Sequence, residues 1–386
     1  MRIVHSCLEW VPITQGWLRD QIVTQFQLGT DLWVAAKRRC GAEPDIPDAR
    51  VSCLSDFPGA IALLERARVA VFDRHSFRNV SDLLTKVDPQ ILHSHFANVA
   101  WQDSVAAQKA GCVHVCSVYG YDIVQLPNQS RRWRKRYDIL AKNLHGVFCE
   151  GPHVRDVMVA QGFDPDRLFI NYLGVDLASL PFHSPIWDKA APLRVLMAAS
   201  FREKKGLPYG IEAIGRFARD HPVELTIIGD AGPAPEQQQE KRKIVAALEK
   251  TGQMSSVRML GYQPHSRLVE EARSHHLFMQ PSVTAANGDT EGGAPVSLIE
   301  MQALGLPVVA TRHCDIPSIV APEYRENLAI ERDVESLYQA LTRLISRSRD
   351  WGSITHHARE YVEENFDLAR QTENQISLYQ RLAERS

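Results

Sequence analysis

The chain has 386 residues, 44% of them hydrophobic, which is enough for a sizeable core and too many residues for one typical domain. Its formal net charge is -2, so the overall charge gives no reason to expect nucleic-acid binding. Any electrostatic recognition has to be local. We therefore expect two domains of about 200 residues or fewer each, and no nucleic acid among the partners.

The seven cysteines contain no CxxC pair and lie mostly in apolar stretches such as VHVCSVYG. This usage is typical of reduced, buried thiols in a reducing compartment. The amino-terminal sequence MRIVHSCLEW lacks the apolar segment of a signal peptide, and no run approaches the ~20 apolar residues of a membrane span. We expect a cytoplasmic chain that is soluble or peripheral at the inner face of the cytoplasmic membrane.

Short apolar runs alternate with amphipathic segments through the first half of the chain. Residues 2–8 predict a strand, and residues 17–28 predict a helix because Leu18, Ile22 and Phe26 recur at four-residue spacing. Further strands are then expected at residues 90–96, 113–120, 146–151 and 167–172, with a helix at residues 99–111 between the first two. Such alternation predicts a parallel sheet covered by helices on both faces.

The same alternation begins again after residue 190. Strands are expected at residues 193–200, 224–230, 257–262, 276–282 and 307–311, and helices at residues 206–220, 241–252, 267–275 and 370–385. Between the halves, residues 177–192 hold three prolines and no periodicity, which is typical of a hinge. The pattern predicts an α/β chain of two doubly wound domains, with the active site at the carboxyl ends of the strands, between the domains.

One further helix is expected after the sequence DTEGGAPVSLIE, residues 289–300. Pro295 suits its first position and Gly305 the position just past its end, so this helix should run from about Pro295 to Leu304. The side-chain-poor loop before it exposes backbone N–H groups at a helix start, which is a favourable place for an anion such as phosphate. This loop consists of Gly292, Gly293 and Ala294.

Carboxylates flank that loop on both sides. Glu300 lies about one and a half turns into the expected helix, where it could accept hydrogen bonds from a ribose diol. Glu291 lies at the mouth of the loop and could hold a second set of hydroxyls. The alternative is a well-capped helix with Asp289 and Glu291 merely solvated.

Seven segments in order along the chain resemble the retaining glycosyltransferases of family 4. EGGAPVSLIEMQALGLPVVAT is similar to the donor-binding signature of that family, two glutamates followed by a small-residue helix and a strand. The other segments are ILHSHF, SVYGYD, NYLGVDL, AASFREKKG, TIIGDAGP and LFMQPS. The resemblance implies the GT-B fold, with an acceptor-binding domain at residues 1–180, a hinge at 181–192 and a donor-binding domain at 193–364. Residues 365–386 would form a helix that packs back towards the first domain.

The resemblance also implies an activity: transfer of a sugar, with retention at the anomeric carbon, from a nucleotide-diphosphate sugar to a glycan or lipid-linked acceptor. The expected setting is biosynthesis of a polysaccharide, lipopolysaccharide or other glycoconjugate. The family needs no divalent metal and no further cofactor, so basic side chains and backbone N–H groups neutralise the leaving diphosphate.

Lys205 matches the phosphate-binding lysine of the family, and Glu300 its ribose-binding glutamate. Ser200 stands where the family has an arginine, and Arg202 could reach in instead. Glu291 best matches the glutamate near the donor sugar, although counting back strictly from Glu300 reaches Gly292, so Asp289 or a backbone group is the alternative. The resemblance assigns further donor contacts to Gly292, Gly293, Ala294, Pro295, Val296 and Tyr262.

On the acceptor side, Tyr119 replaces the active-site histidine of the family, and we assign catalytic roles to Tyr119, Lys205 and Glu291. A tyrosine hydroxyl can donate a hydrogen bond but is no acid–base group near neutral pH. Asp122, His95 and Gly16 are the remaining acceptor-side candidates. His93 and His95 alternate onto one side of a strand with no third ligand nearby, so a lining role is favoured over a metal site.

Between Arg131 and Tyr137 lie five positive charges, and Trp133, Tyr137 and Leu140 recur at helical spacing. The segment predicts a surface helix packed by its aromatic stripe, or one that contacts an anionic membrane surface. Two alternatives to the transferase remain at this stage: an epimerase or phosphorylase on the same fold, or a catalytically degenerate binding protein. The donor base, donor sugar, acceptor, linkage and oligomeric state are not encoded in these motifs.

Overall fold

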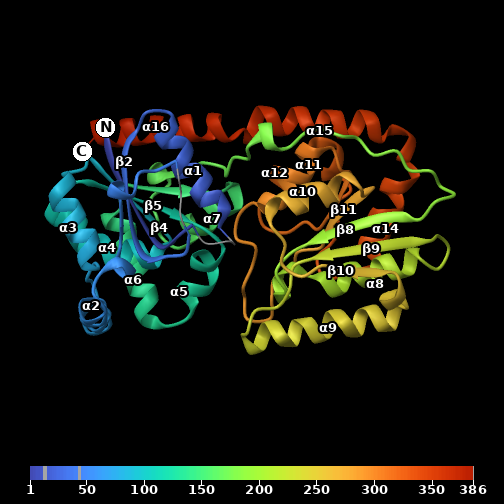
Figure 1. Cartoon of the computed structure of the whole chain (residues 1–386), viewed down its shortest axis with the longest axis horizontal. Coiled ribbons are helices and arrows are strands. Elements are labelled where there is room, and N and C mark those ends of the chain that lie inside the picture. Colours follow the sequence, from blue (N-terminus) through green and yellow to red (C-terminus); the bar gives the residue numbers. More distant parts are fainter. Residues whose placement is uncertain (12–14, 42–44, 386) are drawn as a thin grey trace. The chain divides into compact units, whose positions relative to one another are not determined.

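The computed structural model describes residues 1–11, 15–41 and 45–385 of the chain (Figure 1). The chain divides into two compact units. Unit 1 contains residues 1–174 together with residues 368–386, and unit 2 contains residues 175–367. Each unit is built on one parallel sheet, which confirms the prediction of two doubly wound α/β domains.

Unit 1 holds a seven-stranded sheet in the order β3-β2-β1-β4-β5-β6-β7. Its strands are β1 (Arg2–Trp10), β2 (Asp31–Arg39), β3 (Val51–Cys53), β4 (Ile91–His95), β5 (Val113–Val118), β6 (Gly146–Cys149) and β7 (Leu168–Ile170). Its helices are α1 (Gly16–Gln27), α2 (Gly59–Val71), α3 (Arg78–Val87), α4 (Ala97–Ala110), α5 (Leu126–Asn128), α6 (Arg131–Asn143), α7 (Pro152–Ala160) and α16 (Leu368–Glu384).

Successive residues of a strand point to opposite faces of a sheet, and β1 illustrates the result. Ile3 and Cys7 pack into the cluster under α1 and α16, whereas Val4 packs into the cluster formed with α3. Helix α16 lies beside α1 although more than three hundred residues separate them in the sequence (Figure 1). The sheet of unit 1 is therefore buried on both faces, as its apolar strands predict.

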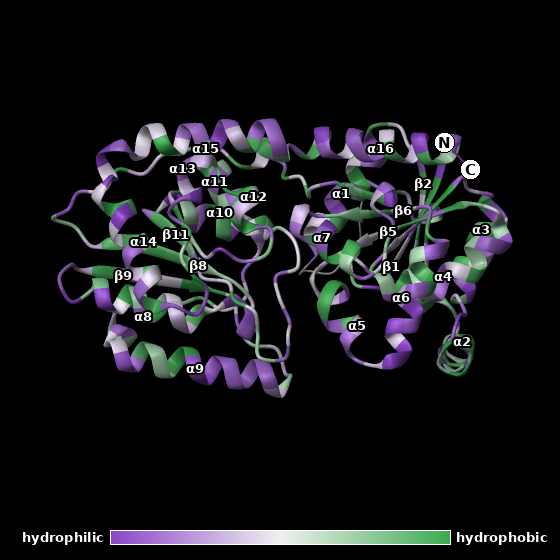
Figure 2. Cartoon of the chain, turned by 180° about the vertical axis from the view of Figure 1, so that it is seen from behind, coloured by the Kyte–Doolittle hydropathy of each residue, from purple (hydrophilic) through white to green (hydrophobic). Residues whose placement is uncertain are grey.

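Unit 2 holds a five-stranded sheet in the order β10-β9-β8-β11-β12. Its strands are β8 (Leu193–Ala198), β9 (Val223–Ile228), β10 (Val257–Met259), β11 (Leu277–Gln280) and β12 (Val308–Ala310). Its helices are α8 (Leu207–Phe217), α9 (Pro235–Thr251), α10 (His265–Arg273), α11 (Val296–Leu304), α12 (Ile316–Ile319), α13 (Pro322–Arg325), α14 (Val334–Ser346) and α15 (Trp351–Phe366). In Figure 2 the strands of both units are predominantly hydrophobic, and the helices mix both classes of residue.

Several expected boundaries are shifted in the structure, and three of them are informative. Helix α9 begins at Pro235, six residues before the predicted start, because its first turns are polar and show no apolar period. Helix α11 begins at Val296, with Pro295 as its N-cap at φ -65°. Residues 181–192 belong to unit 2, where the backbone N–H of His183 donates to the carbonyl of Leu304.

Among the described residues, no helix is long and apolar enough to cross a membrane. None of the cysteines in the described ranges forms a disulfide, and five of the seven are buried. The burial agrees with the expectation that most of the thiols are buried.

Candidate functional site

The segments that follow β8, β9, β10 and β11 meet at one edge of the unit 2 sheet, because parallel strands end on the same side. Backbone hydrogen bonds join them: the N–H of Phe201 donates to the carbonyl of Asp230, and the N–H of Gly229 to that of Gly261. The predicted donor residues Ser200, Arg202 and Tyr262 all lie in these segments. Tyr262 is half-exposed and Arg202 is exposed.

Two glycines allow this close packing. Gly229 has φ +121°, and a Cβ atom there would lie 1.9 Å from the carbonyl oxygen of Ala199. Gly206 has φ +63°, and its Cβ atom would lie 1.9 Å from the carbonyl oxygen of Pro281. Only glycine fits both the backbone angle and the space at these positions. The loop that carries Lys205 is thereby held against the segment after β11.

Two lysine–carboxylate pairs join those same two segments. Nζ of Lys205 donates to Oε2 of Glu291 at 2.7 Å, and Nζ of Lys204 lies 3.2 Å from Oδ1 of Asp289. Lys204 also donates to the carbonyl of Thr290 at 2.7 Å. Asp289, expected as a solvated residue in the alternative interpretation, is largely buried and ion-paired. Lys204 is a site residue that the sequence analysis missed, although it directly precedes Lys205 in the quoted segment AASFREKKG.

The carboxylate of Glu291 is nearly enclosed, with a side chain 4% exposed. The hydroxyl of Ser282 donates to its Oε1 at 2.7 Å, and its backbone N–H donates to Nε2 of His313. Burial by itself would raise the pKa of Glu291, but the charges of Lys205 and Lys204 outweigh it and lower the pKa to about 2. Glu291 is therefore a fixed negative charge beside a fixed positive one.

The extra residue between Glu291 and Glu300 falls in the loop ahead of α11. Gly292 is left-handed at φ +82°, which turns the chain between Glu291 and the helix. Ser297, in the first turn of α11, donates to Oε1 of Gln280 at 3.0 Å and so connects the helix start to the end of β11. Gly293, Ala294, Pro295 and Val296 form the backbone between these points, and the first three are buried. A helix start is a favourable place for an anion, although Pro295 itself has no N–H to donate.

Glu300 lies one turn after Ser297 on α11, with a side chain 15% exposed. Its Oε1 atom lies 2.8 Å from Nε2 of His265, the first residue of α10. His265 is a second partner that the sequence analysis missed, because no local pattern connects residues 35 positions apart. The predicted roles of Glu300 at ribose and Glu291 at the sugar stay predictions.

In unit 1, the acceptor-side candidates lie on a buried polar network beneath α1 and α16. The hydroxyl of Tyr119 is 2.8 Å from Nδ1 of His95, and Nε2 of His95 is 3.0 Å from Nδ1 of His5. Nε2 of His5 is in turn 3.1 Å from Oε1 of Gln25, whose amide donates to Gln375 of α16. Burial raises the pKa of the Tyr119 hydroxyl well above its ordinary value, so this group keeps its proton.

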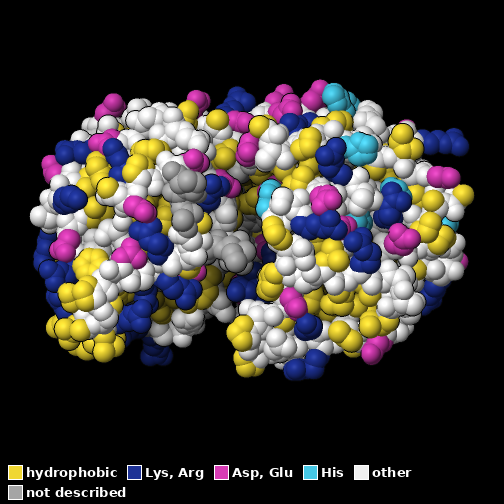
Figure 3. All heavy atoms as spheres, viewed as in Figure 1, with side chains coloured by type: hydrophobic (Ala, Val, Ile, Leu, Met, Phe, Trp, Pro, Cys, Tyr) yellow, Lys and Arg dark blue, Asp and Glu magenta, His cyan; other side chains and the backbone are white. Residues whose placement is uncertain are grey.

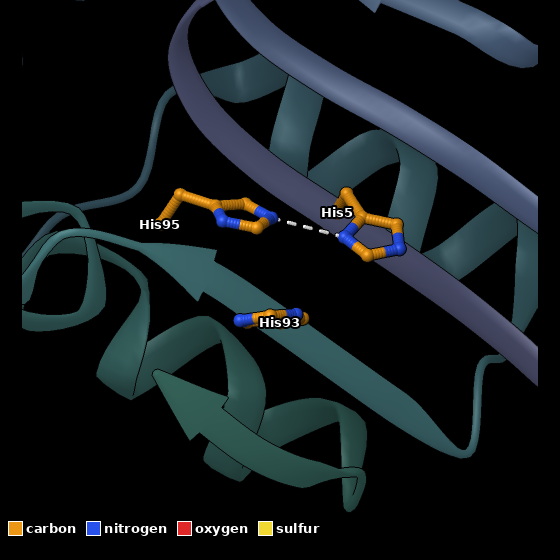
Figure 4. A group of neighbouring side chains, drawn as sticks. All are labelled: His5, His93 and His95. Atoms are coloured by element: carbon orange, nitrogen blue, oxygen red, sulfur yellow. Dashed lines mark hydrogen bonds between the residues drawn. The ribbon is translucent and has the colours of Figure 1, made fainter. Parts of the chain in front are cut away.

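The expectation that no third histidine accompanies His93 and His95 was wrong. His5 of β1 pairs in register with His93 of β4, and the ligand atoms of the three rings lie within 4.8 Å of one another (Figure 4). This arrangement could hold a metal ion in principle. Each ring nitrogen, however, already has a hydrogen-bond partner, since Nδ1 and Nε2 of His93 lie 2.6 Å from Tyr379 and 2.8 Å from Ser117. The geometry favours a satisfied core network over a metal centre.

Asp122 is fully buried, and both of its carboxylate oxygens accept backbone hydrogen bonds. The N–H of Tyr119 donates to Oδ1 and the N–H of Ala97, at the start of α4, donates to Oδ2, each at 2.7 Å. Asp122 therefore holds the loop that carries Tyr119 and has no surface to offer a ligand directly. Gly16 is the first residue of α1, and a Cβ atom added there would meet nothing within 4 Å. Thr14, which precedes it in the TQGW turn, lies outside the described residues.

Comparison with known proteins places these features in a family. A family model described as glycosyl transferases group 1 matches residues 185–364, and one described as glycosyltransferase family 4 matches residues 28–179. The chain is 31% identical over 229 residues to amylovoran biosynthesis glycosyltransferase AmsK of Erwinia amylovora, covering 59% of this chain and 52% of the relative. It is 30% identical over 207 residues to putative colanic acid biosynthesis glycosyltransferase WcaL of Escherichia coli (strain K12), covering 53% of this chain and 49% of the relative.

The chain thus spans about half the length of the curated relatives it matches. Among solved structures, sucrose-phosphate synthase from Thermosynechococcus elongatus superposes with a TM-score of 0.78 at 16% identity, over 100% of both chains. Anabaena Alr3699/HepE in complex with UDP superposes with a TM-score of 0.76 at 15% identity, over 99% of this chain and 100% of that one. At these identities the likeness shows the fold alone, and that fold is GT-B.

Proposed function

Because the chain belongs to the group 1 glycosyl transferases, we propose that it is a retaining, metal-independent glycosyltransferase acting on a nucleotide-diphosphate sugar. The acceptor is a glycan or a lipid-linked glycan in polysaccharide, lipopolysaccharide or other glycoconjugate biosynthesis, at the cytoplasmic face of a membrane. The relatives AmsK and WcaL support this setting, since their names assign them to the biosynthesis of amylovoran and colanic acid.

One observation carries the proposal: the ion pair of Lys205 and Glu291 lies just ahead of α11 in the chain, and α11 is the helix that contains Glu300. The ammonium group of Lys205 and the N–H groups at the helix start supply positive charge for a diphosphate. Glu300 supplies an acceptor for ribose hydroxyls. Together they offer the recognition elements of a nucleoside diphosphate without a metal ion.

In the transfer, the bond between the anomeric carbon and the donor phosphate oxygen breaks, and the acceptor oxygen bonds to the same face of that carbon. The acceptor proton passes to the leaving phosphate oxygen. Lys205 stabilises the negative charge that grows on the leaving group, and Glu291 holds Lys205 and the sugar hydroxyls in place. Tyr119, kept protonated, contributes a hydrogen bond rather than a proton transfer.

Nucleotide binding is the first test. HepE is described in complexes with UDP and UDP-glucose, so UDP is the first ligand to titrate, followed by GDP and ADP. Glu300→Ala should weaken binding by about 10- to 100-fold, because a charge-assisted hydrogen bond contributes about 1.5–3 kcal/mol. Glu270→Ala is the matched control, since the carboxylate of Glu270 is 68% exposed on α10 and pairs only with the surface residue Arg267 among the contacts described. Calorimetric titration with no binding of any nucleotide by the unaltered chain would contradict the proposal.

Transfer itself is tested with a panel of nucleotide sugars and oligosaccharide acceptors. The product should keep the anomeric configuration of the donor by NMR, and the rate should persist with EDTA present. An inverted product would reject the retaining mechanism, and loss of activity with EDTA that Mg²⁺ restores would reject metal independence. Epimerisation without an acceptor, or turnover that needs free phosphate, would identify the alternative activities on the same fold.

A further inference from the structure

Helix α2 of unit 1 exposes its apolar residues to solvent. The side chains of Leu63, Leu64, Val71 and Phe72 are 69%, 64%, 75% and 59% exposed. Leu63, Leu64 and Val71 lie on one side of the helix with the exposed Ala67 and Ala70, at three- and four-residue spacing, and Phe72 follows directly after the last helical residue. An amphipathic helix of a globular domain ordinarily turns that side to the core. We call the following set the apolar face: Leu63, Leu64, Ala67, Ala70, Val71 and Phe72.

The opposite side of α2 is fixed to unit 1, so the helix cannot simply roll over. Glu65 is buried, and its Oε2 accepts the backbone N–H of Arg78 at 3.1 Å. Its Oε1 accepts from Arg68 at 2.8 Å. Ala62 and Val69, on the same side, pack against the core under α3. Turning the apolar face inward would carry the buried Glu65 carboxylate away from the backbone N–H of Arg78, which is unfavourable.

Positive charge surrounds the apolar face. Arg66 and Arg68 are exposed on α2 and flank the face on its two sides, as their spacing of 100° per residue requires. Asp73, directly after Phe72, pairs with Arg132 at 2.8 Å and with Arg136, so the first turns of α6 adjoin the end of α2. Figure 3 shows a patch of hydrophobic side chains over α2 with Lys and Arg side chains beside it.

Two of the cations of α6, Arg132 and Arg136, are paired with Asp73. Arg136 is mostly buried and lies over the rings of Trp133 and Trp101, so it anchors the two helices to each other. The remaining exposed cations on the first turns of α6 are Arg131, Arg134 and Lys135.

We propose that α2 and the first turns of α6 form a membrane-docking face for a bilayer that contains anionic lipid. The apolar face of α2 enters the boundary between headgroups and acyl chains, and the cations of both helices bind the lipid phosphates. Hydrophobic insertion next to a basic cluster is the chemistry that holds a protein at such a surface. The proposal extends the contact expected for α6 by naming the element that inserts, and it does not depend on donor binding in unit 2.

Charge complementarity favours lipid over a second copy of the chain. A symmetric dimer through α2 would place the arginines of one copy against the same arginines of the other. The two acidic groups beside the face, Glu65 and Asp73, are already paired with arginines of their own chain and cannot neutralise a partner. An anionic bilayer presents negative charge and an apolar interior together, which matches both parts of the surface.

Vesicle co-sedimentation of the full chain tests the proposal. Phosphatidylcholine vesicles containing about 30% phosphatidylglycerol should bind the chain, and pure phosphatidylcholine vesicles should bind it at least ~10-fold less. Leu63→Gln/Leu64→Gln should reduce binding at least ~10-fold at every salt concentration. Arg131→Gln/Arg134→Gln/Lys135→Gln should reduce it mainly below about 0.15 M salt, where screening is weak. Ile186→Gln/Ile330→Gln, at two exposed isoleucines of unit 2, is the matched control and should bind like the unaltered chain.

Circular dichroism and UDP titration of each variant show that both units remain folded, so lost vesicle binding is attributable to the surface. Equal vesicle binding by the Leu63/Leu64 variant and the unaltered chain would overturn the proposal, as would no binding of anionic vesicles by the unaltered chain. Sedimentation velocity adds a further outcome. A dimer that Leu63→Gln/Leu64→Gln dissociates, with no vesicle binding, would show that a second copy covers α2 and would also overturn it.

Discussion

Lys205 and Glu291 form an ion pair of unequal burial: the Nζ–Oε2 distance is 2.7 Å, and the side chains are 20% and 4% exposed. The lysine can turn towards water if its partner is removed, whereas the carboxylate cannot. An uncompensated buried charge costs more than an uncompensated exposed one. The two halves of the pair should therefore differ in their contributions to stability although they share one contact.

We expect Lys205→Met to destabilise unit 2 by about 3 kcal/mol, since it leaves Glu291 buried with Lys204 as its nearest remaining cation. Glu291→Gln should cost about 1 kcal/mol, because the amide still accepts from Ser282 and Lys205 can be solvated. The double variant should recover most of the loss of Lys205→Met in urea unfolding, while UDP binding stays weak in all three.

The exposed pair Lys250–Glu212, 2.9 Å apart, is the control for this cycle. Its coupling energy should be below about 1 kcal/mol, as for other exposed ion pairs. Equal losses from Lys205→Met and Glu291→Gln would contradict the unequal burial as the cause.

Alanine substitutions at two glycines can distinguish the cost of backbone strain from the cost of a steric clash. Gly206 and Gly252 have φ of +63° and +72°, but a Cβ atom meets the carbonyl of Pro281 at the first position and open space at the second. Gly252→Ala should cost about 1 kcal/mol, the strain of a left-handed alanine. Gly206→Ala should cost more than about 3 kcal/mol and abolish UDP binding, because the loop bearing Lys205 has to move. Urea unfolding and UDP titration measure both, and similar losses for the two variants would be contrary to the packing at Gly206.

The histidine network of unit 1 predicts acid sensitivity. Burial lowers the pKa of His5 to about 4 from its ordinary 6.5, despite the opposing hydrogen bond with Gln25. The unfolded chain therefore binds more protons than the folded chain between these two values. The stability contributed by neutral His5 is complete above pH 6.5 and is lost as the pH falls towards 4, by about 1.4 kcal/mol per pH unit.

Replacing His5 should reduce this pH dependence. His5→Gln should lower the slope of unfolding free energy against pH by about one proton between pH 4 and 6.5. His356→Gln, at a ring 62% exposed in unit 2, is the control variant. A slope unaffected by His5→Gln would mean that His5 does not stay neutral in the folded chain.

Tyr119 should affect transfer without affecting donor binding. Tyr119→Phe removes the hydroxyl that contacts His95, and we expect transfer to fall by about 10- to 100-fold from the loss of the hydrogen bond proposed for Tyr119 in the transfer. UDP affinity should change by less than about 2-fold, since the proposed donor residues lie in unit 2. Tyr121→Phe, which removes a surface hydroxyl bonded to Gln129, is the control. Unchanged transfer in Tyr119→Phe would remove Tyr119 from the catalytic residues.

The fold was predictable because parallel strands covered on both faces have to be apolar along their length. ELTIIGD and LRVLMAAS are such runs, and they became β9 and β8. Two strands were not predicted: β2, although it carries the apolar run LWVAA, and edge strand β3, which has only three residues and gave no comparable signal. The predicted donor residues Ser200 and Lys205 follow β8, and Tyr262 follows β10 of the same sheet. Their positions after expected strands were therefore enough to place them at one edge of the sheet.

The partners of those residues were not predictable, because they depend on strand order and register. His5 meets His93 only since β4 lies next to β1, and Lys205 meets Glu291 across 86 positions because β11 lies next to β8. The side of α2 that faces solvent is likewise decided by the bonds of Glu65. Amino-acid sequence alone predicted most of the strands, through their apolar runs, and the helices that have a clear apolar period. The tertiary structure decided which charges meet, since contact between distant residues follows from how the elements pack and not from local pattern.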